Sequence, residues 1–258
     1  MVNSADDLKK LFQSAANGGE ISKQASDIII NSIDGTNISG CVGADIDEIE
    51  TDDLTIVSLV LDASLSMKQN ENSVRQGYDS LIQSLQNSKQ AGSMLVSARM
   101  FSGNQTIFYG FKKVEEIDLI EEDYIADGHS TALYDTLVDA MTGIRAYVKN
   151  LNDNGIRTKC IVVVFSDGDD NDSHMNKASD VKILAEDFLK SEMFYLVYVG
   201  YKQNDDDDLN IIANKVGFPS ILTTQATGSE IRKTMDLVSK SIIKTSQSQI
   251  GGGNSFFS

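Results

Sequence analysis

The sequence predicts an α/β protein of the Rossmann-like, doubly wound class. Its mostly parallel, six-stranded sheet would carry one antiparallel edge strand and helices on both faces. Short apolar runs alternate along the chain with amphipathic segments of helical period, which is typical of a parallel sheet buried under helices. Only Ser102, Gly103 and Asn104 separate two neighbouring apolar runs. These two runs should therefore form a tight hairpin, which makes one edge of the sheet antiparallel.

Residues 1–50 are predicted to form an accessory N-terminal arm. Ser4 and Asp7 resemble a capping box at the start of one short helix, and a second short helix is expected over 22–33. Residues 34–53 are rich in Gly, Asn, Asp and Glu, which indicates an extended linker. Because neither helix carries enough apolar surface for a separate core, the arm is expected to be either mobile or docked.

The main domain is predicted to span residues 51–246. Strands are expected at 54–61, 94–101, 105–111, 160–165, 193–199 and 220–223. Helices are expected at 71–87, 132–150, 179–190, 208–216 and 227–245. The remaining residues, 247–258, form a Gly-rich tail that ends in Phe256 and Phe257. The tail is predicted to be flexible, with docking of its paired aromatic residues into a partner's groove as the alternative.

The composition excludes several classes of partner. The net charge is −16 and the pI is about 4.4, so the surface repels nucleic-acid phosphates and anionic lipids. No apolar stretch is long enough to cross a bilayer, and the N-terminus does not resemble a secretory signal. Two reduced thiols, Cys41 and Cys160, are favoured over a single disulfide. We therefore expect a cytoplasmic protein that binds neither nucleic acid nor membrane.

The candidate functional residues lie where predicted strands end or a helix begins. Asp62, Ser64 and Ser66 form the motif D-A-S-L-S directly after the first strand, and Asp167 lies in S-D-G after the fourth. Thr131 directly precedes the helix at 132–150. The carboxyl ends of parallel strands are where an open α/β sheet gathers a ligand. Hydroxyl and carboxylate oxygens suit Mg²⁺, and also Mn²⁺ or Ca²⁺, so the sequence predicts a cation site.

This combination of motifs resembles the metal-ion-dependent adhesion site of the von Willebrand factor A (VWA) family, over about residues 54–246. The resemblance implies a VWA fold and an intact site. In that site Ser64 and Ser66 ligate the cation through their hydroxyls, and Thr131 supplies a third hydroxyl, directly or through water. Asp62 and Asp167 hold water ligands and neutralise charge. Neutral ligands leave the cation short of negative charge, so a partner's Asp or Glu fills the open position.

The resemblance also implies a class of function, that of a prokaryotic intracellular adaptor. Such an adaptor presents a client to a MoxR-type AAA+ ATPase, or works with a kinase and phosphatase in a stress system. A structural protein whose arm and tail join copies together is the alternative. A metal-dependent hydrolase is the least favoured class.

Simpler structural explanations exist for each motif. Asp62 and Ser64 are common helix caps, Thr131 could be an N-cap, and the turn at Asp167 could merely end a strand. Ser130 could also replace its neighbour as the ligand. The presence of all three motifs in the family's order favours metal binding. The acidic run that follows, Asp169, Asp170 and Asp172, is interpreted as a solvated loop rather than as a second cation site or a contact for a basic partner.

Catalysis is not expected. A serine nucleophile would need a nearby histidine, and the chain contains only His129 and His174. Haloacid-dehalogenase phosphatases carry a second aspartate where this chain has Ser64. Two histidines and two distant cysteines do not have the spacing of a zinc cluster. We therefore expect a binding protein without enzymatic activity.

Overall fold

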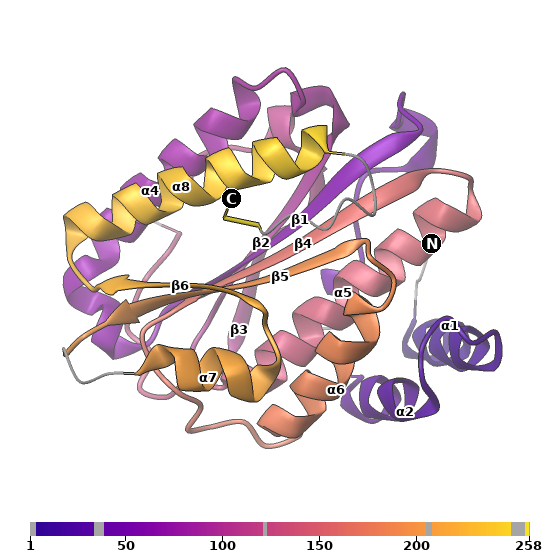
Figure 1. The fold of residues 1–258 in the computed structure, drawn as a ribbon, viewed down its shortest axis with the longest axis horizontal. Coiled ribbons are helices and arrows are strands. Elements are labelled where there is room, and N and C mark those ends of the chain that lie inside the picture. The colour runs from indigo at the N-terminus through magenta and orange to yellow at the C-terminus, as the bar shows by residue number, and fades with distance from the viewer. Residues whose placement is uncertain (1–3, 34–38, 121–122, 205–207, 249–255, 258) are drawn as a thin grey trace.

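A six-stranded mixed sheet forms the centre of the molecule (Figure 1). The computed structural model describes residues 4–33, 39–120, 123–204, 208–248 and 256–257. Its strands are β1 (Asp53–Asp62), β2 (Met94–Phe101), β3 (Gln105–Lys113), β4 (Arg157–Ser166), β5 (Phe194–Lys202) and β6 (Ser220–Gln225). They lie in the order β3-β2-β1-β4-β5-β6, and only β3 runs antiparallel to its neighbour. The predicted fold class is confirmed.

Helices cover both faces of the sheet because its strands are apolar on both sides. One face packs against α4 (Glu71–Gln86) and α8 (Gly228–Gln247). The other packs against α5 (Leu133–Asp153), α6 (Ala178–Leu189) and α7 (Leu209–Val216). Short 3-10 turns lie at η1 (Ile46–Glu48), η2 (Leu65–Asn70), η3 (Ala91–Ser93) and η4 (Val114–Glu116). In β1, Val57 and Leu59 face the first helix layer while Ile56 and Val60 face the second, as the twofold period of a strand requires.

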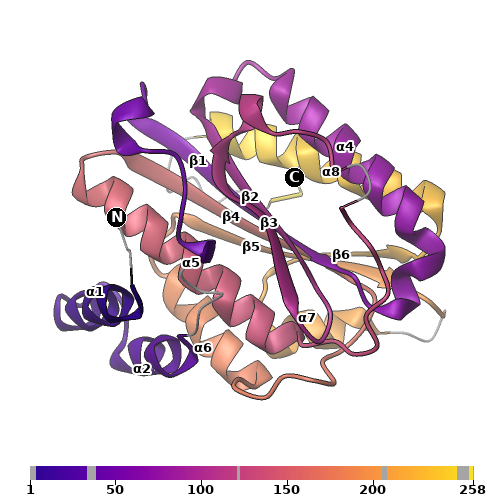
Figure 2. The ribbon, with the colours of Figure 1, turned by 180° about the vertical axis from the view of Figure 1, so that it is seen from behind.

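The N-terminal arm is docked. Its helices α1 (Ala5–Asn17) and α2 (Lys23–Ser32) lie outside α5 and α6 in both views of the fold (Figures 1 and 2). The Ser4 hydroxyl caps α1 by accepting a hydrogen bond from the Asp7 amide at 3.2 Å. Leu8, Phe12 and Ile29 are fully buried in the same apolar cluster as α5 and α6. The two helices therefore extend the core of the main domain instead of forming their own.

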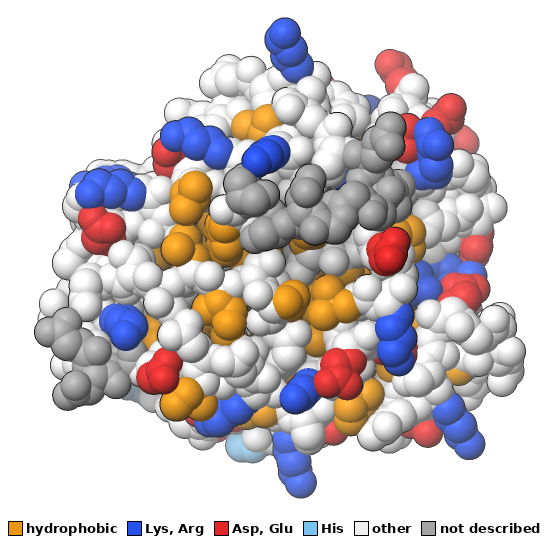
Figure 3. Space-filling view, viewed as in Figure 1, with side chains coloured by type: hydrophobic (Ala, Val, Ile, Leu, Met, Phe, Trp, Pro, Cys, Tyr) orange, Lys and Arg blue, Asp and Glu red, His pale blue; other side chains and the backbone are white. Residues whose placement is uncertain are grey.

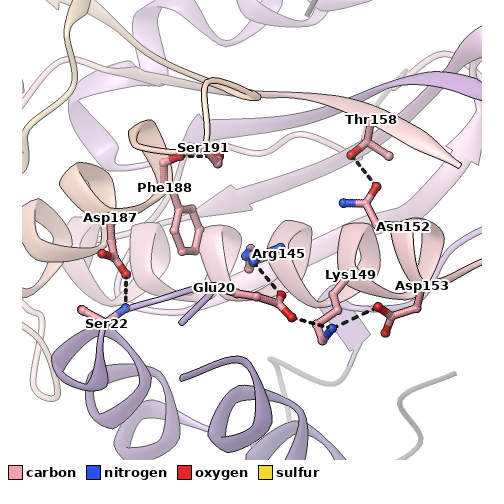
Figure 4. A network of polar contacts seen from close by, with 10 residues as sticks. All are labelled: Glu20, Ser22, Arg145, Lys149, Asn152, Asp153, Thr158, Asp187, Phe188 and Ser191. Carbon is pink, nitrogen blue, oxygen red and sulfur yellow. Dashed lines mark hydrogen bonds and ion pairs between the residues drawn. The ribbon is translucent and has the colours of Figure 1, made fainter. Parts of the chain in front are cut away.

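Polar contacts also hold the arm in place, as Figure 4 shows. Glu20, between the two helices, forms ion pairs with Arg145 at 3.2 Å and Lys149 at 3.1 Å, both on α5. The Ser22 amide donates to Asp187 on α6 at 2.6 Å. These contacts come from two different helices of the main domain, so they restrict the orientation of the arm as well as its position.

The described part of the predicted linker is bound along the outer edge of the sheet. The Phe111 amide in β3 donates to the carbonyl of Val42 at 2.9 Å, and the Ala44 amide donates back to Phe111 at 2.7 Å. Gly43 pairs with Phe111 at this point, where a Cβ would lie 2.6 Å from the Tyr147 ring. Residues 39–44 thus cover an exposed strand edge, which explains why they are ordered. Residues 34–38 of the linker lie outside the described residues.

The opposite edge of the sheet is formed by β6. Residues Ser220–Thr224 of this strand are half-buried, whereas β1, β4 and β5 are almost entirely buried. Figure 3 shows apolar side chains on this side of the molecule, interspersed with charges of both signs. The acidic charge of the chain is therefore not concentrated on this face.

The end of the chain packs against its own domain. Phe256 is only 2% exposed and belongs to the apolar cluster under α8. Its ring centroid lies 6.3 Å from that of Tyr195 on β5 and 5.0 Å from that of Phe257. The prediction of a flexible tail therefore does not hold at Phe256, because burial of its ring offsets the cost of ordering the chain. The preceding residues, 249–255, lie outside the described residues.

Replacing Phe256 tests this packing. Phe256→Ala should lower the free energy of unfolding by about 1.5–3 kcal/mol, the value for a fully buried apolar side chain. Phe257→Ala should cost less because Phe257 is only partly buried. Urea unfolding followed by circular dichroism measures both. Equal and negligible effects of the two changes would show that the tail is not docked in solution.

Candidate functional site

Two of the sequence motifs meet where neighbouring strands end. Asp62 is the last residue of β1, and Asp167 follows the last residue of β4, its parallel neighbour. The Asp62 carboxylate accepts hydrogen bonds from the Ser64 amide at 2.9 Å and from the Ser166 hydroxyl at 2.6 Å. The hydrogen bond from Ser166 links the two motifs directly, across 104 positions of sequence.

The serine hydroxyls form a chain that leads to the second carboxylate. The Oγ atoms of Ser64 and Ser66 lie 2.9 Å apart, and Ser66 Oγ donates to Asp167 Oδ1 at 2.9 Å. Asp62, Ser64 and Asp167 are 1%, 5% and 7% exposed, whereas Ser66 is exposed. Three of these four residues are therefore buried, and the site is accessible to solvent at Ser66.

Thr131 reaches the group through its loop. The amide of Leu65, between the two serines, donates to the Gly128 carbonyl at 2.7 Å, and the Gly128 amide donates back to Ala63 at 3.2 Å. Thr131 lies three residues beyond Gly128 and is 6% exposed. Among the described residues, no hydrogen bond joins its hydroxyl to Ser64 or Ser66. The structure thus joins four of the five predicted residues by hydrogen bonds and brings the loop of the fifth beside them.

The simple capping explanations do not account for two of these residues. Ser64 precedes η2, but its side chain makes no capping hydrogen bond. The N-cap of α5 is Ala132, one residue after Thr131. The turn after β4 does have an ordinary component, because the Gly168 amide donates to the Ser166 hydroxyl at 3.3 Å. The hydroxyls of Ser64 and Ser66 are directed instead toward each other and toward Asp167.

Two buried carboxylates, those of Asp62 and Asp167, repel each other at this site. Burial, and secondly the charge of Asp167, raise the pKa of Asp62 from 3.8 to about 6. Hydrogen bonds from Ser166 and Ser64 act in the opposite direction but are weaker. A positive ion beside these carboxylates would offset both the burial and the repulsion.

Three residues of the site were not assigned a role from the sequence, although Ser166 belongs to the S-D-G motif. Ser166 donates to Asp62, as described above. The Tyr124 hydroxyl donates to the Asp62 carbonyl at 2.5 Å, and Tyr124 is fully buried. Gln203 donates through Nε2 to Asp167 Oδ2, and to the Ser66 carbonyl at 3.2 Å. Gln203 directly follows β5, so its strand-end position could have signalled it; Tyr124 carries no such signal.

The donor set fits a hard divalent cation. The five predicted residues offer a cation only hydroxyl and carboxylate oxygens, which are the ligands that Mg²⁺, Mn²⁺ and Ca²⁺ prefer. In the described part of the chain, no group of three or more His, Cys, Asp or Glu side chains is arranged to hold a metal. A site built mainly of hydroxyl oxygens does not require such a group.

The fold and this group of residues define an open α/β domain with hydroxyl and carboxylate oxygens gathered at the ends of its central strands. A family model described as the von Willebrand factor type A domain matches residues 57–236. The chain belongs to the von Willebrand factor type A domain family. A search of curated protein sequences found no match.

Several solved structures share the fold. The pilus adhesin SpaC of Lactobacillus rhamnosus GG, in an open conformation, matches with a TM-score of 0.55 and 14% identity, over 75% of this chain and 30% of that one. The PilB minor pilin of Streptococcus sanguinis matches with a TM-score of 0.55 and 13% identity, over 77% of this chain and 64% of that one. The vWF domain of the type V pili tip protein Mfa5 of Porphyromonas gingivalis matches with a TM-score of 0.50 and 10% identity, over 76% and 97%.

These similarities are limited to the fold. The chain spans less than two thirds of the length of SpaC and of PilB, and its identity to all three proteins is low. Within the described residues, no helix is both long enough and apolar enough to cross a lipid bilayer.

Proposed function

We propose that this domain holds a divalent cation, Mg²⁺ or else Mn²⁺ or Ca²⁺, through Ser64, Ser66 and Thr131, and thereby binds an Asp or Glu of a protein partner. The observation that carries the proposal is the hydrogen-bonded chain from Ser64 through Ser66 to Asp167. Along this chain the Ser66 hydroxyl is exposed to solvent, while Ser64 and both carboxylates are buried. When bound, the cation would supply an open coordination position for an external carboxylate.

The protein's own residues prepare the site for this role. Ser166 and the Ser64 amide orient the Asp62 carboxylate, and Ser66 orients one oxygen of Asp167. Burial of both aspartates keeps their negative charge weakly screened, so it acts strongly on a nearby cation. The exposed position of Ser66 gives a partner access from solvent.

A binding role without catalysis is part of the proposal. Both histidines, His129 and His174, are exposed. His174 Nε2 lies 3.4 Å from the Asp172 carboxylate rather than beside a serine. The structural similarity to a pilus adhesin and to pilus tip and minor pilin proteins also supports a role in protein binding.

The cellular setting of the adaptor is also proposed. A cytoplasmic location is favoured by Cys41 and Cys160, which are both buried and are not joined to each other by a disulfide. The prokaryotic intracellular class and the AAA+ ATPase or kinase–phosphatase partners rest on the family resemblance. The pilus proteins among the structural neighbours favour the cell surface instead.

Self-assembly through the arm and tail is the second candidate, and the same neighbours, which include a minor pilin, favour it. The packing of both segments on their own domain speaks against it. Phe12 of the arm and Phe256 of the tail are at most 2% exposed. Light scattering in Mg²⁺ and in EDTA separates the two classes, since assembly unaffected by chelation would favour the structural role.

Removing both serine hydroxyls tests the metal site. In wild type, Mg²⁺ or Mn²⁺ at a hundred times its Kd should stabilise the fold by about 2.7 kcal/mol. For a chain of this size that raises Tm by roughly 2–4 °C per kcal/mol. Ser64→Ala with Ser66→Ala should abolish this increase and the heat of binding in calorimetry. The same variant, and wild type in EDTA, should also lose the partner in a pull-down.

A matched pair on α4 provides the control. Ser80→Ala with Ser84→Ala removes two hydroxyls from the second half of α4, away from the end of the helix that follows Ser66, so metal binding should stay unchanged. The proposal would be overturned if wild type took up none of the three cations. Partner binding that persists in EDTA would contradict only the proposed capture of a partner's carboxylate, and not the metal site itself.

A further inference from the structure

The acidic loop after β4 is bound to the start of α5. The carboxylate of Asp169 accepts from the Tyr134 hydroxyl at 2.6 Å and pairs with Lys215 at 2.8 Å. Asp172 accepts from the Ser130 hydroxyl at 2.7 Å. Asp169 is exposed and Asp172 partly exposed, so these carboxylates contact solvent as expected from the sequence, but they also bind other parts of the domain.

The N-terminal turn of α5 binds the loop in return. The Asp135 carboxylate accepts hydrogen bonds from the amides of His174 and Asn176, each at 2.8 Å. The Asp135 amide donates to the Ser173 hydroxyl at 3.0 Å. The loop and the helix start therefore form one hydrogen-bonded unit, which begins only two residues after Asp167.

Asn171 lies at the centre of this unit and contacts Thr131 in both directions. Its side-chain Oδ1 accepts from the Thr131 amide at 2.7 Å, and its own amide donates to the Thr131 carbonyl at 2.9 Å. The Asp172 amide donates to the same carbonyl at 3.2 Å. Both polar groups of the Thr131 backbone are thus held by the loop that carries Asp167.

We infer that Asn171 is a positioning residue that places the Thr131 hydroxyl for cation binding. The inference rests on the proposed metal-binding function. Thr131 lies one residue before Ala132, the N-cap of α5, and within the described part of the chain its side chain makes no hydrogen bond to the serines. The direction of its hydroxyl therefore depends on how its backbone is held. Through Asn171, the third hydroxyl keeps a defined position relative to Asp167. Residues that orient metal ligands typically contribute 10–100-fold to metal affinity.

The test uses the full-length chain and Mn²⁺ as the probe. Asn171→Ala should weaken the Kd for Mn²⁺ in calorimetry by about 10–100-fold. Because Asn171 is exposed and its loop keeps its other contacts, Tm in EDTA should remain close to that of wild type. Asn171→Asp retains an acceptor for the Thr131 amide, so it should bind Mn²⁺ at least as tightly as wild type.

A double-variant cycle shows whether Asn171 acts through Thr131. Thr131→Ala and Thr131→Ala/Asn171→Ala should have the same weakened Kd, because the second change has no ligand left to misplace. Asn154→Ala, at the far end of α5, is the matched control and should leave the Kd unchanged. Independent, additive losses would overturn the inference, as would Asn171→Ala binding like wild type. Failure of wild type itself to bind Mn²⁺, Mg²⁺ or Ca²⁺ would instead overturn the proposed function.

Discussion

Replacing Arg99 by methionine should lower the free energy of unfolding by about 3–5 kcal/mol, the cost of removing one partner of a buried ion pair. The side chains of Arg99 and Asp139 are 2% and 4% exposed, and Arg99 Nη1 lies 2.8 Å from Asp139 Oδ2. Arg99 on β2 also donates to Gln105 on β3 at 3.1 Å. Without the guanidinium, the Asp139 carboxylate on α5 would remain in an apolar interior with little water to solvate it.

Two further variants define this effect. Arg99→Met with Asp139→Leu removes both charges and should recover most of the lost stability, because a well-packed apolar pair often replaces a buried ion pair without cost. The exposed pair Arg157–Asp53, at 2.6 Å, is the comparison. Arg157→Met should change the free energy of unfolding by less than about 1 kcal/mol. Urea unfolding measures all three, and an Arg99→Met effect no larger than that of Arg157→Met would contradict burial of the pair.

Replacing Phe12 by alanine should cost about 3–5 kcal/mol, as large-to-small changes at buried aromatic residues do. Phe12 on α1 is fully buried in the apolar cluster that contains α5 and α6. The backbone carbonyl of Phe12 also accepts a hydrogen bond from the Ser26 hydroxyl on α2 at 3.1 Å, which keeps the two helices together. The loss should therefore affect the whole domain, not only the arm.

Lys10 provides the control for this prediction because it is exposed on the same helix. Lys10→Ala should change stability by no more than about 0.5 kcal/mol. Global unfolding is followed by far-ultraviolet circular dichroism during a urea titration. If α1 were only loosely attached, Phe12→Ala would leave the main transition in place and would increase hydrogen exchange only in residues 4–33.

The order of strands and helices could be predicted because each has a local signature. Apolar runs such as 54–61 and 160–165 are bounded by polar residues, and helices such as α5 show a clear helical period. The hairpin between β2 and β3 followed from a connection only three residues long. These features depend on neighbours within a few positions, so the strands and helices agree with prediction to within a few residues at their ends.

The candidate site could be predicted only in part. Asp62, Ser64, Ser66 and Asp167 follow strands, and parallel strands bring their ends to the same edge. Gln203 also contacts the site, and its position directly after a strand could have indicated this. The contact of Tyr124 depends on a side-chain direction that a linear pattern does not contain. Metal binding by these residues remains a prediction, to be tested by the serine and Asn171 variants.

The sequence by itself determined the α/β class, the order of its elements and the gathering of hydroxyls and carboxylates at the strand ends. Only the tertiary structure decided that α1 and α2 complete the core, that Phe256 packs under α8, and that Asn171 holds Thr131. These last features join residues far apart along the chain or in different loops. Each depends on how closely two parts of the folded chain approach each other. Short-range patterns of polarity carry no information about that distance.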